Sequence, residues 1–325
     1  MRRPTSRPSP TSASPETARR PSSPNRPHPN DRRRRLMTDV AVLGLGNMGA
    51  ALARAFLAKG HATAVWNRTP AKAQALAELG ARVSPDAASA IRVAPISLVC
   101  VERYDQVRAL LEEADAAGAL AGSAIVNVTW GSPEEARDME TWVADRGAQY
   151  LDSDIYDYPD AIGNDIPVVP YAGGRAVYDR FADLLSALGP AHYHGPDPAV
   201  PNILGSAVAA YHHVAAAAFF EAAAYADGYG VSPREFLEFN ALVGQPLTER
   251  AVRRGVAEIE DGDFRAGQAS LHAHYDAAIV NRDDRRRIGQ PAPMLAAFCD
   301  LVEPLLANQG DLELAAIFQP LRAER

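Results

Sequence analysis

The feature that most constrains this chain is the glycine-rich sequence GLGNMG at residues 44–49. The apolar run Val40–Leu43 precedes it, and the alanine-rich stretch Ala50–Lys59, typical of a helix, follows. In such a strand–turn–helix unit the three glycines permit a tight turn, close approach of a pyrophosphate, and packing of helix on strand. The free N–H groups of the first helical turn then face the phosphates. We therefore expect a dinucleotide to bind Gly44, Leu45, Gly46, Asn47, Met48 and Gly49.

The end of the next strand selects the cofactor. His61–Trp66 is typical of a strand, and enzymes that use NAD place Asp or Glu at its end to bind the ribose 2′-hydroxyl. This chain has Asn67, Arg68 and Thr69 instead. A guanidinium beside a hydroxyl suits a 2′-phosphate, because it donates charge-assisted hydrogen bonds. The sequence therefore predicts NADPH rather than NADH. The alternative is that Arg68 is a solvated surface charge.

Further short β-rich runs predict a doubly wound sheet. They lie at 96–101, 124–129, 150–155 and 168–171, with helical stretches between them. Ligands of such sheets bind beyond the carboxyl ends of the strands. This rule nominates Val101 and Thr129 for the cofactor, and Trp130, Asp154, Tyr156 and Tyr158 for the substrate side.

Composition separates a tail from the folded chain. Residues 1–36 are rich in Arg, Pro and Ser and hold ten Arg, so we expect a disordered tail. A basic nucleic-acid arm, a targeting peptide or a chain that starts at Met37 are alternatives, whereas no apolar segment follows to make a secretory signal. The whole chain has a formal net charge of −7 despite this tail, so the folded part is acidic and we expect no nucleic-acid partner.

Cysteine content and hydropathy indicate the compartment. The chain has two cysteines, Cys100 and Cys299, which give no disulfide framework and no cysteine-based metal site. We found no uninterrupted apolar run of the ~18 residues that a membrane span requires. We therefore expect a cytoplasmic protein without a membrane partner or a bound metal.

The amino-acid composition changes near Pro196, after which the chain becomes rich in alanine. We expect a nucleotide-binding domain at 37–197 and a helical substrate and dimerisation domain at 198–325. The second domain opens with a long alanine-rich helix, Ser206–Asp227, whose apolar residues run almost all round. Such a helix is buried on several sides, which suggests a partner subunit. His272 and His274 are two residues apart, so this helical spacing does not suit a metal.

Taken together, these motifs resemble the imine reductases, a branch of the β-hydroxyacid dehydrogenase superfamily with a 6-phosphogluconate dehydrogenase-like fold. The matching segments are GLGNMG with WNRTP, VNVTWGSPEEA, YLDSDIYDYPDAIG with PYAGG, the long helix, and ASLHAH. The resemblance implies an α/β Rossmann domain, a long interdomain helix and an all-α domain. It also implies a homodimer that interchanges helices, and hydride transfer from NADPH to a C=N carbon of a small imine substrate.

Two departures concern the proton donor. The superfamily's hydroxyacid dehydrogenases use a lysine on the interdomain helix, but this chain has only Lys59 and Lys72, both in the first domain. Imine reductases commonly place Asp or Tyr at the corresponding position, which by ungapped counting is Gly205. The candidates to replace it are His213, its neighbour His212, Asp154 and Tyr158, with helix packing, solvation or a pocket wall as the alternatives. By resemblance, His274 lines the mouth of the neighbouring subunit's pocket, or packs within its own helix.

The sequence thus predicts an NADPH-dependent imine or iminium reductase. An NADP-dependent reductase or dehydrogenase of a carbonyl substrate is the alternative within enzymes. The loss of the usual donor at Gly205 also leaves open a non-catalytic NADP-binding protein.

Overall fold

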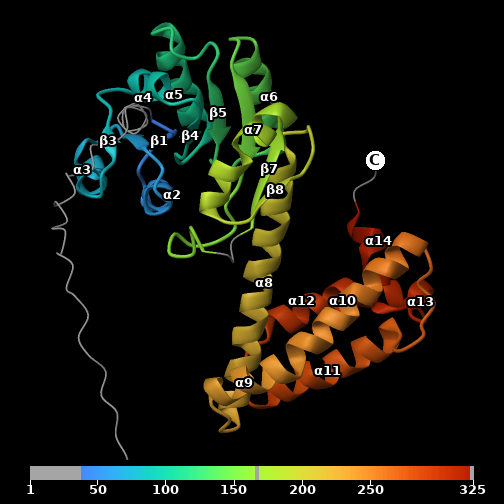
Figure 1. The fold of residues 1–325 in the computed structure, drawn as a ribbon. Helices are drawn as coiled ribbons and strands as arrows, with labels where there is room; N and C mark the ends of the chain where they lie inside the picture. The colour runs from blue at the N-terminus through green and yellow to red at the C-terminus, as the bar shows by residue number, and fades with distance from the viewer. Residues whose placement is uncertain (1–37, 165–167, 323–325) are drawn as a thin grey trace, which may run out of the picture.

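Residues 38–164 and 168–322 are described by the computed structural model (Figure 1). The tail expected at 1–36 lies outside the described residues. An eight-stranded sheet has the order β3-β2-β1-β4-β5-β6-β7-β8, and all neighbouring strands are parallel except β6 and β7. The strands are β1 (Val40–Leu43), β2 (Thr63–Trp66), β3 (Arg82–Val83), β4 (Ser97–Val99), β5 (Ala124–Asn127), β6 (Gln149–Ser153), β7 (Val169–Gly173) and β8 (Ala191–Tyr193).

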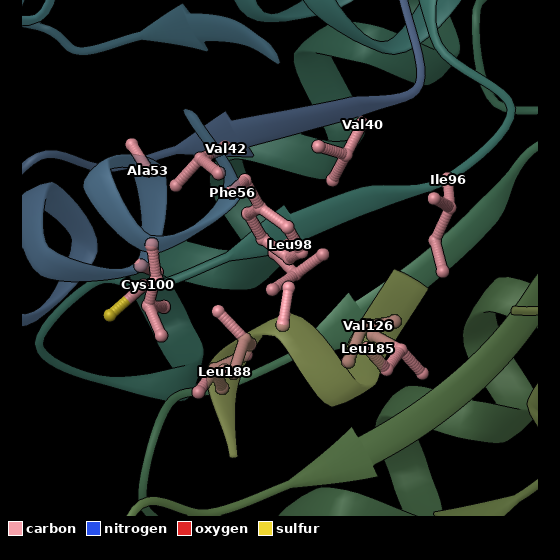
Figure 2. Close-up of a cluster of buried hydrophobic side chains, with 14 of the residues drawn as sticks. Val40, Val42, Ala53, Phe56, Ile96, Leu98, Cys100, Val126, Leu185 and Leu188 are labelled. Carbon is pink, nitrogen blue, oxygen red and sulfur yellow. The ribbon is translucent and has the colours of Figure 1, made fainter. Parts of the chain in front are cut away.

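Helices cover both faces of this sheet. Successive strand side chains point to opposite faces, so the continuous apolar run of β1 is buried on both. Val40 and Val42 join the cluster beneath α2 and α7, together with Phe56, Leu98 and Leu185 (Figure 2). Ala41 and Leu43 belong to the opposite cluster, with α4, α5 and α6. The helices are α2 (Asn47–Ala58), α3 (Ala71–Glu78), α4 (Ala87–Val93), α5 (Tyr104–Ala116), α6 (Pro133–Ala144), α7 (Arg175–Leu185) and the short 3₁₀ turn η1 (Ser186–Leu188).

The strand order reverses between β1 and β4. From β1 the chain builds outward through β2 to β3, then returns to the other side of β1 with β4. A crevice opens at such a switch point, beyond the carboxyl ends of the two strands. The glycine turn that follows β1 and Val101 beyond β4 both border this crevice. The predicted doubly wound Rossmann domain is confirmed.

A long helix, α8 (Val200–Gly228), leaves the sheet and carries a second, all-helical part at its far end (Figure 1). A small core of Leu271, Val302 and Ala316 holds that part together. Its elements are α9 (Pro233–Leu242), α10 (Gly244–Asp261), α11 (Leu271–Arg287), α12 (Pro293–Val302), η2 (Glu303–Leu305), α13 (Leu306–Gln309), η3 (Leu314–Ile317) and α14 (Phe318–Leu321).

Polar contacts join α8 to the helical part. The Glu221 carboxylate accepts the N–H groups of Met294 at 2.7 Å and Leu295 at 3.2 Å, so it satisfies free donors in the first turn of α12. Nearer the C-terminal end of α8, the hydroxyls of Tyr225 and Tyr229 both donate to Asp284 of α11. These hydrogen bonds attach α11 and α12, which are distant in sequence, to the C-terminal part of α8.

The long helix begins six residues before the predicted start at Ser206. Pro201 occupies the first turn of this helix, where a missing N–H group costs no helical hydrogen bond. Most of α8 is also exposed within one chain, since its buried residues are Pro201, Asn202, Gly205 and Ala223. The expected burial on several sides is therefore not met by the chain's own residues.

The hydropathy of α8 corrects a second expectation. Val200–Gly228 is long and apolar enough to cross a membrane by length and composition, with a mean hydropathy of 1.4 over an 18-residue window. His212, His213, Glu221 and Asp227 interrupt the apolar run, but they leave the mean hydropathy of that window high enough for a membrane span. Yet Asn202 at one end and Glu221 near the other both bind polar groups of other elements. Such anchoring is typical of a helix packed against protein.

Candidate functional site

The glycine turn has the geometry that its sequence predicts. A Cβ on Gly44, whose φ is +93°, would lie 2.2 Å from the carbonyl oxygen of Cys100, and one on Gly49 would lie 1.9 Å from that of Gly44. At Gly46, in contrast, a Cβ would meet no atom within 4 Å. Packing therefore requires glycine at positions 44 and 49. Gly46, in contrast, leaves the space in front of the first turn of α2 open. That turn has no side-chain cap and no acidic residue, so its N–H groups remain available to an anion.

A cavity of about 620 Å³ lies along this turn. All the predicted cofactor-binding residues except Thr129 line it. One wall is the end of β2, where the Asn67 side chain accepts the N–H group of Leu45 at 2.8 Å and so fixes the turn. The opposite wall is Val101 and the first turns of α5. The lining residues from the predicted set are Gly44, Leu45, Gly46, Asn47, Met48, Gly49, Asn67, Arg68, Thr69 and Val101.

The lining of the cavity includes cations as well as carboxylates. Arg68 and Thr69 line it as predicted, together with Lys72 of α3, and Glu102 and Glu113 line it as well. Lys72 was not predicted as a site residue, although it lies in the first turn of a helix whose first turn holds no acidic residue. A cation is unfavourable at the positive end of a helix dipole unless an anion is bound nearby.

Thr129 lies behind the cavity wall. Its side chain is buried, and its hydroxyl accepts the N–H group of Val101 at 3.2 Å. It therefore positions Val101 and does not line the cavity. The neighbouring Trp130 is 59% exposed, and Gly131 donates its N–H group to Asn202 at 2.8 Å.

A buried polar cluster fastens α8 to the carboxyl edge of the sheet. The Asp152 carboxylate of β6 is fully buried and accepts the hydroxyls of Tyr104 and Tyr150, each at 2.6 Å, and the amide of Asn202 at 2.9 Å. A longer bond of 3.4 Å comes from Asn127. Burial raises the pKa of Asp152 to about 7, against the effect of these donors. Because Asn202 also accepts the N–H group of Gly131, one side chain of α8 joins two strand ends.

Asp154 lies two residues beyond Asp152 on the same strand end. It is 7% exposed, and burial raises its pKa to about 6, while the N–H group of Ile155 donates to Oδ1 at 2.8 Å. A Cβ on Gly205 would lie 2.0 Å from Asp154 Oδ2 and 2.7 Å from the ring of Tyr156. The hydroxyl of Tyr156 donates to the carbonyl of Pro201. The structure therefore brings together three predicted site residues, Asp154, Tyr156 and Gly205.

The other candidates lie apart from this group within one chain. Tyr158 is 70% exposed in the loop after β6. His212 and His213 are exposed on α8 with their ring centroids 5.5 Å apart, and His274 is half-buried on α11. In the described residues of a single chain, none of these four side chains lines the cavity at the glycine turn.

Comparison with known proteins agrees with this architecture. Residues 39–195 match the family described as the NAD binding domain of 6-phosphogluconate dehydrogenase. An NADPH-dependent reductive aminase of Aspergillus oryzae is 35% identical over 159 residues, which are 49% of this chain and 53% of that protein. The chain therefore spans about half the length of this curated relative.

Solved structures extend the likeness to the helical part. A reductive aminase from Aspergillus terreus, in complex with NADPH4, cyclohexanone and allyl amine, is 31% identical with a TM-score of 0.80 over 88% of this chain and all of its own. An imine reductase from Myxococcus stipitatus in complex with NADP⁺ is 30% identical, with a TM-score of 0.80 over 87% of this chain and all of its own. This chain belongs to the imine reductase and reductive aminase family. The family resemblance predicted from the sequence is thus confirmed.

In this member of the family, Asn202 and Lys72 are site residues that were not predicted from the sequence. An Asn inside a long apolar helix was a signal, because a buried amide needs partners. Its partner Asp152 could not be singled out from the sequence, because it lies in an acid-rich segment and most carboxylates in such segments are solvated. Only the packing of α8 against β6 distinguishes Asp152 and Asp154 from the acidic residues that follow.

Proposed function

We propose that this chain is an NADPH-dependent reductase that transfers hydride to an imine or iminium carbon and yields an amine. The observation that carries the proposal is the cavity at the glycine turn, with its open face at Gly46 and its cations Arg68 and Lys72. The relatives with imine reductase and reductive aminase names support the choice of reaction. Two buried, unpaired cysteines fit a reducing compartment, and we place the protein in the cytoplasm.

The residues present fit a dinucleotide phosphate. The first turn of α2 would hold the pyrophosphate on backbone N–H groups, since no side chain or acidic group competes there. Arg68, Thr69 and Lys72 would hold the 2′-phosphate by charge-assisted hydrogen bonds. When bound, NADPH supplies the hydride. The protein fixes the geometry, which lowers the barrier by removing orientational freedom from the reactants.

The test is NADPH consumption by the purified protein with separate panels of cyclic imines, amine–ketone mixtures and ketones alone. We expect the absorbance of NADPH to fall with the imines and to remain steady with ketones alone. Consumption with ketones alone would instead favour a carbonyl reductase. Tight NADPH binding without turnover of any panel would indicate a non-catalytic NADP-binding protein.

We further propose that the active unit is a homodimer with interchanged helices. Exposed apolar side chains follow α8, and a surface of this kind normally marks a protein interface. Exposed apolar side chains also occur on α9 and α10, so much apolar surface on these three helices lacks a cover within the described residues of one chain. Its large members include Val208, Tyr211, Val214, Phe220, Leu237, Phe239, Leu242, Leu247, Val252 and Val256. In this arrangement the partner's helical part encloses the substrate, and His212, His213, Tyr158 and His274 are available to line the shared pocket.

Light scattering during gel filtration tests the dimer. We expect twice the chain mass of 34.8 kDa for the wild type. Val214→Asp should raise the dimer dissociation constant at least about tenfold, because it buries an unpaired charge in the interface. The matched control is Leu79→Asp, which changes an equally exposed apolar side chain at the end of α3. A monomeric wild type, or equal effects of the two substitutions, would refute the proposed interface.

A further inference from the structure

Asp152 of β6 and Asp154, just past the end of that strand, meet two residues of α8 in register. Side chains two apart on a strand point to the same face, and residues three apart on a helix lie on one side. Asp152 receives a hydrogen bond from Asn202, and one helical turn later Gly205 faces Asp154. The Asp152–Asn202 bond therefore fixes which part of the helix lies opposite Asp154.

Asp154 also lies in line with the cofactor cavity. Across the sheet, Val99 of β4 pairs with Asn127 of β5, which pairs with Asp152 of β6. Val101, Thr129 and Asp154 each follow these residues by two positions, past the ends of β4, β5 and β6, and the Thr129 hydroxyl accepts the N–H group of Val101. With strands ~4.8 Å apart, the ends of β4 and β6 lie roughly 10 Å apart, so Asp154 is at the same edge of the sheet as the cavity wall at Val101.

The carboxyl group is poised to carry a proton. Its one hydrogen bond within the described residues comes from Ile155 to Oδ1, so Oδ2 has no donor to hold it as the anion. Burial raises its pKa to about 6, which increases the protonated fraction near neutral pH. Asp152, by contrast, is held by several donors and has no free oxygen to offer.

The geometry points to Asp154 as the catalytic acid of this reductase, with Gly205 as the residue whose missing side chain makes room for the carboxyl group. This inference rests on the proposed imine reduction. The carboxylic O–H bond breaks as a new N–H bond forms on the imine nitrogen, which leaves a carboxylate beside an iminium cation. Hydride from NADPH then brings two electrons to the iminium carbon and completes the amine. Solvent returns a proton to Asp154.

The experiment compares a neutral cyclic imine with its N-methylated iminium salt, which needs no proton. Asp154→Asn should lower kcat on the neutral imine at least about 100-fold, because general acid catalysis contributes that much or more. On the iminium salt we expect a change within about fivefold. Wild-type kcat on the neutral imine should fall as the pH rises through about 6, since the acid form is lost, and this dependence should vanish in Asp154→Asn. Asp157→Asn, in the same loop, is the matched control.

Equal losses on both substrates, or no loss on either, would overturn the assignment while the reductase activity stands. A wild type that reduces neither substrate would overturn the proposed function itself, and the assignment with it. NADPH binding by Asp154→Asn, measured by calorimetry, establishes that the variant is folded.

A second pair of variants tests the role of Gly205. Gly205→Ala should lower the melting temperature of the wild type, because its Cβ would lie 2.0 Å from Asp154 Oδ2. In an Asp154→Ala background the same substitution should lower it less, because only the close approach to the Tyr156 ring, at 2.7 Å, remains. The exchange Asp154→Ala with Gly205→Asp should recover at least about tenfold of the activity that Asp154→Ala loses. Equal destabilisation by Gly205→Ala in both backgrounds would contradict the steric pairing.

Discussion

Gly49→Ala is expected to destabilise the nucleotide-binding domain, whereas Gly46→Ala is expected to leave its stability nearly unchanged and to impair NADPH binding. The new Cβ at position 49 would lie 1.9 Å from the backbone carbonyl oxygen of Gly44, which cannot move without distorting the turn. Overpacking of this kind costs about 1–3 kcal/mol, and sometimes more when backbone is involved. Thermal and urea unfolding without cofactor measure this loss.

The substitution at Gly46 is the matched partner, because it adds the same methyl group three residues away. No atom lies within 4 Å of its Cβ, so we expect the free energy of unfolding to change by no more than about 1 kcal/mol. The methyl group would instead occupy the space in front of α2. We expect the dissociation constant for NADPH to rise at least about tenfold, or 1.4 kcal/mol. Unaltered NADPH affinity in Gly46→Ala would show that the pyrophosphate does not lie at this turn.

The double variant Arg68→Ala with Lys72→Ala should lose the preference for NADPH. Each charge-assisted hydrogen bond contributes about 1.5–3 kcal/mol, so removing two groups should cost about 3 kcal/mol or more. This corresponds to a rise of roughly 100-fold in the NADPH KM. The KM for NADH should change by no more than about twofold, because NADH has no 2′-phosphate. Steady-state kinetics with both cofactors give the comparison.

Arg82→Ala is the control for the loss of charge. This exposed arginine lies on the edge strand β3 and does not line the cavity. A similar KM change for NADPH and NADH in the double variant would contradict the assignment of the 2′-phosphate to Arg68 and Lys72. The single variants then measure how much each cation contributes.

The first half of the fold could be predicted because its rules are local. The apolar run of β1, the glycine spacing and the alanine-rich helix all lie within a short stretch, and each has one common structural solution. The capping box at Ser132 and Glu135 also follows from adjacent residues, and the structure contains both of its hydrogen bonds. The start of α8 was predicted six residues too late, at Ser206, because proline is compatible with a first helical turn as well as with a loop.

The candidate site beyond the cavity depends on contacts that no local pattern reveals. Asn202 and Asp152 are 50 residues apart, and Gly205 meets Asp154 only because α8 crosses the end of β6. In the sequence, Gly205 indicates only that the family's usual Asp or Tyr side chain is missing from the helix. In the structure, the carboxyl group of Asp154 occupies the space that a side chain at position 205 would need. Pairing of this kind requires knowledge of the helix register.

The attachments of α8 have a mechanical consequence. One end is pinned to the sheet through Asn202, and the other is fastened to α11 and α12 through Tyr225 and Glu221. Between these points the helix is continuous, so it forms a rigid connection between the sheet and the helical part. Opening and closing of the substrate site would then require α8 to rotate about its contacts with the sheet, or the two subunits to move relative to each other. Loosening the pivot at Asn202 should therefore alter the rates of substrate entry and product departure as well as thermal stability.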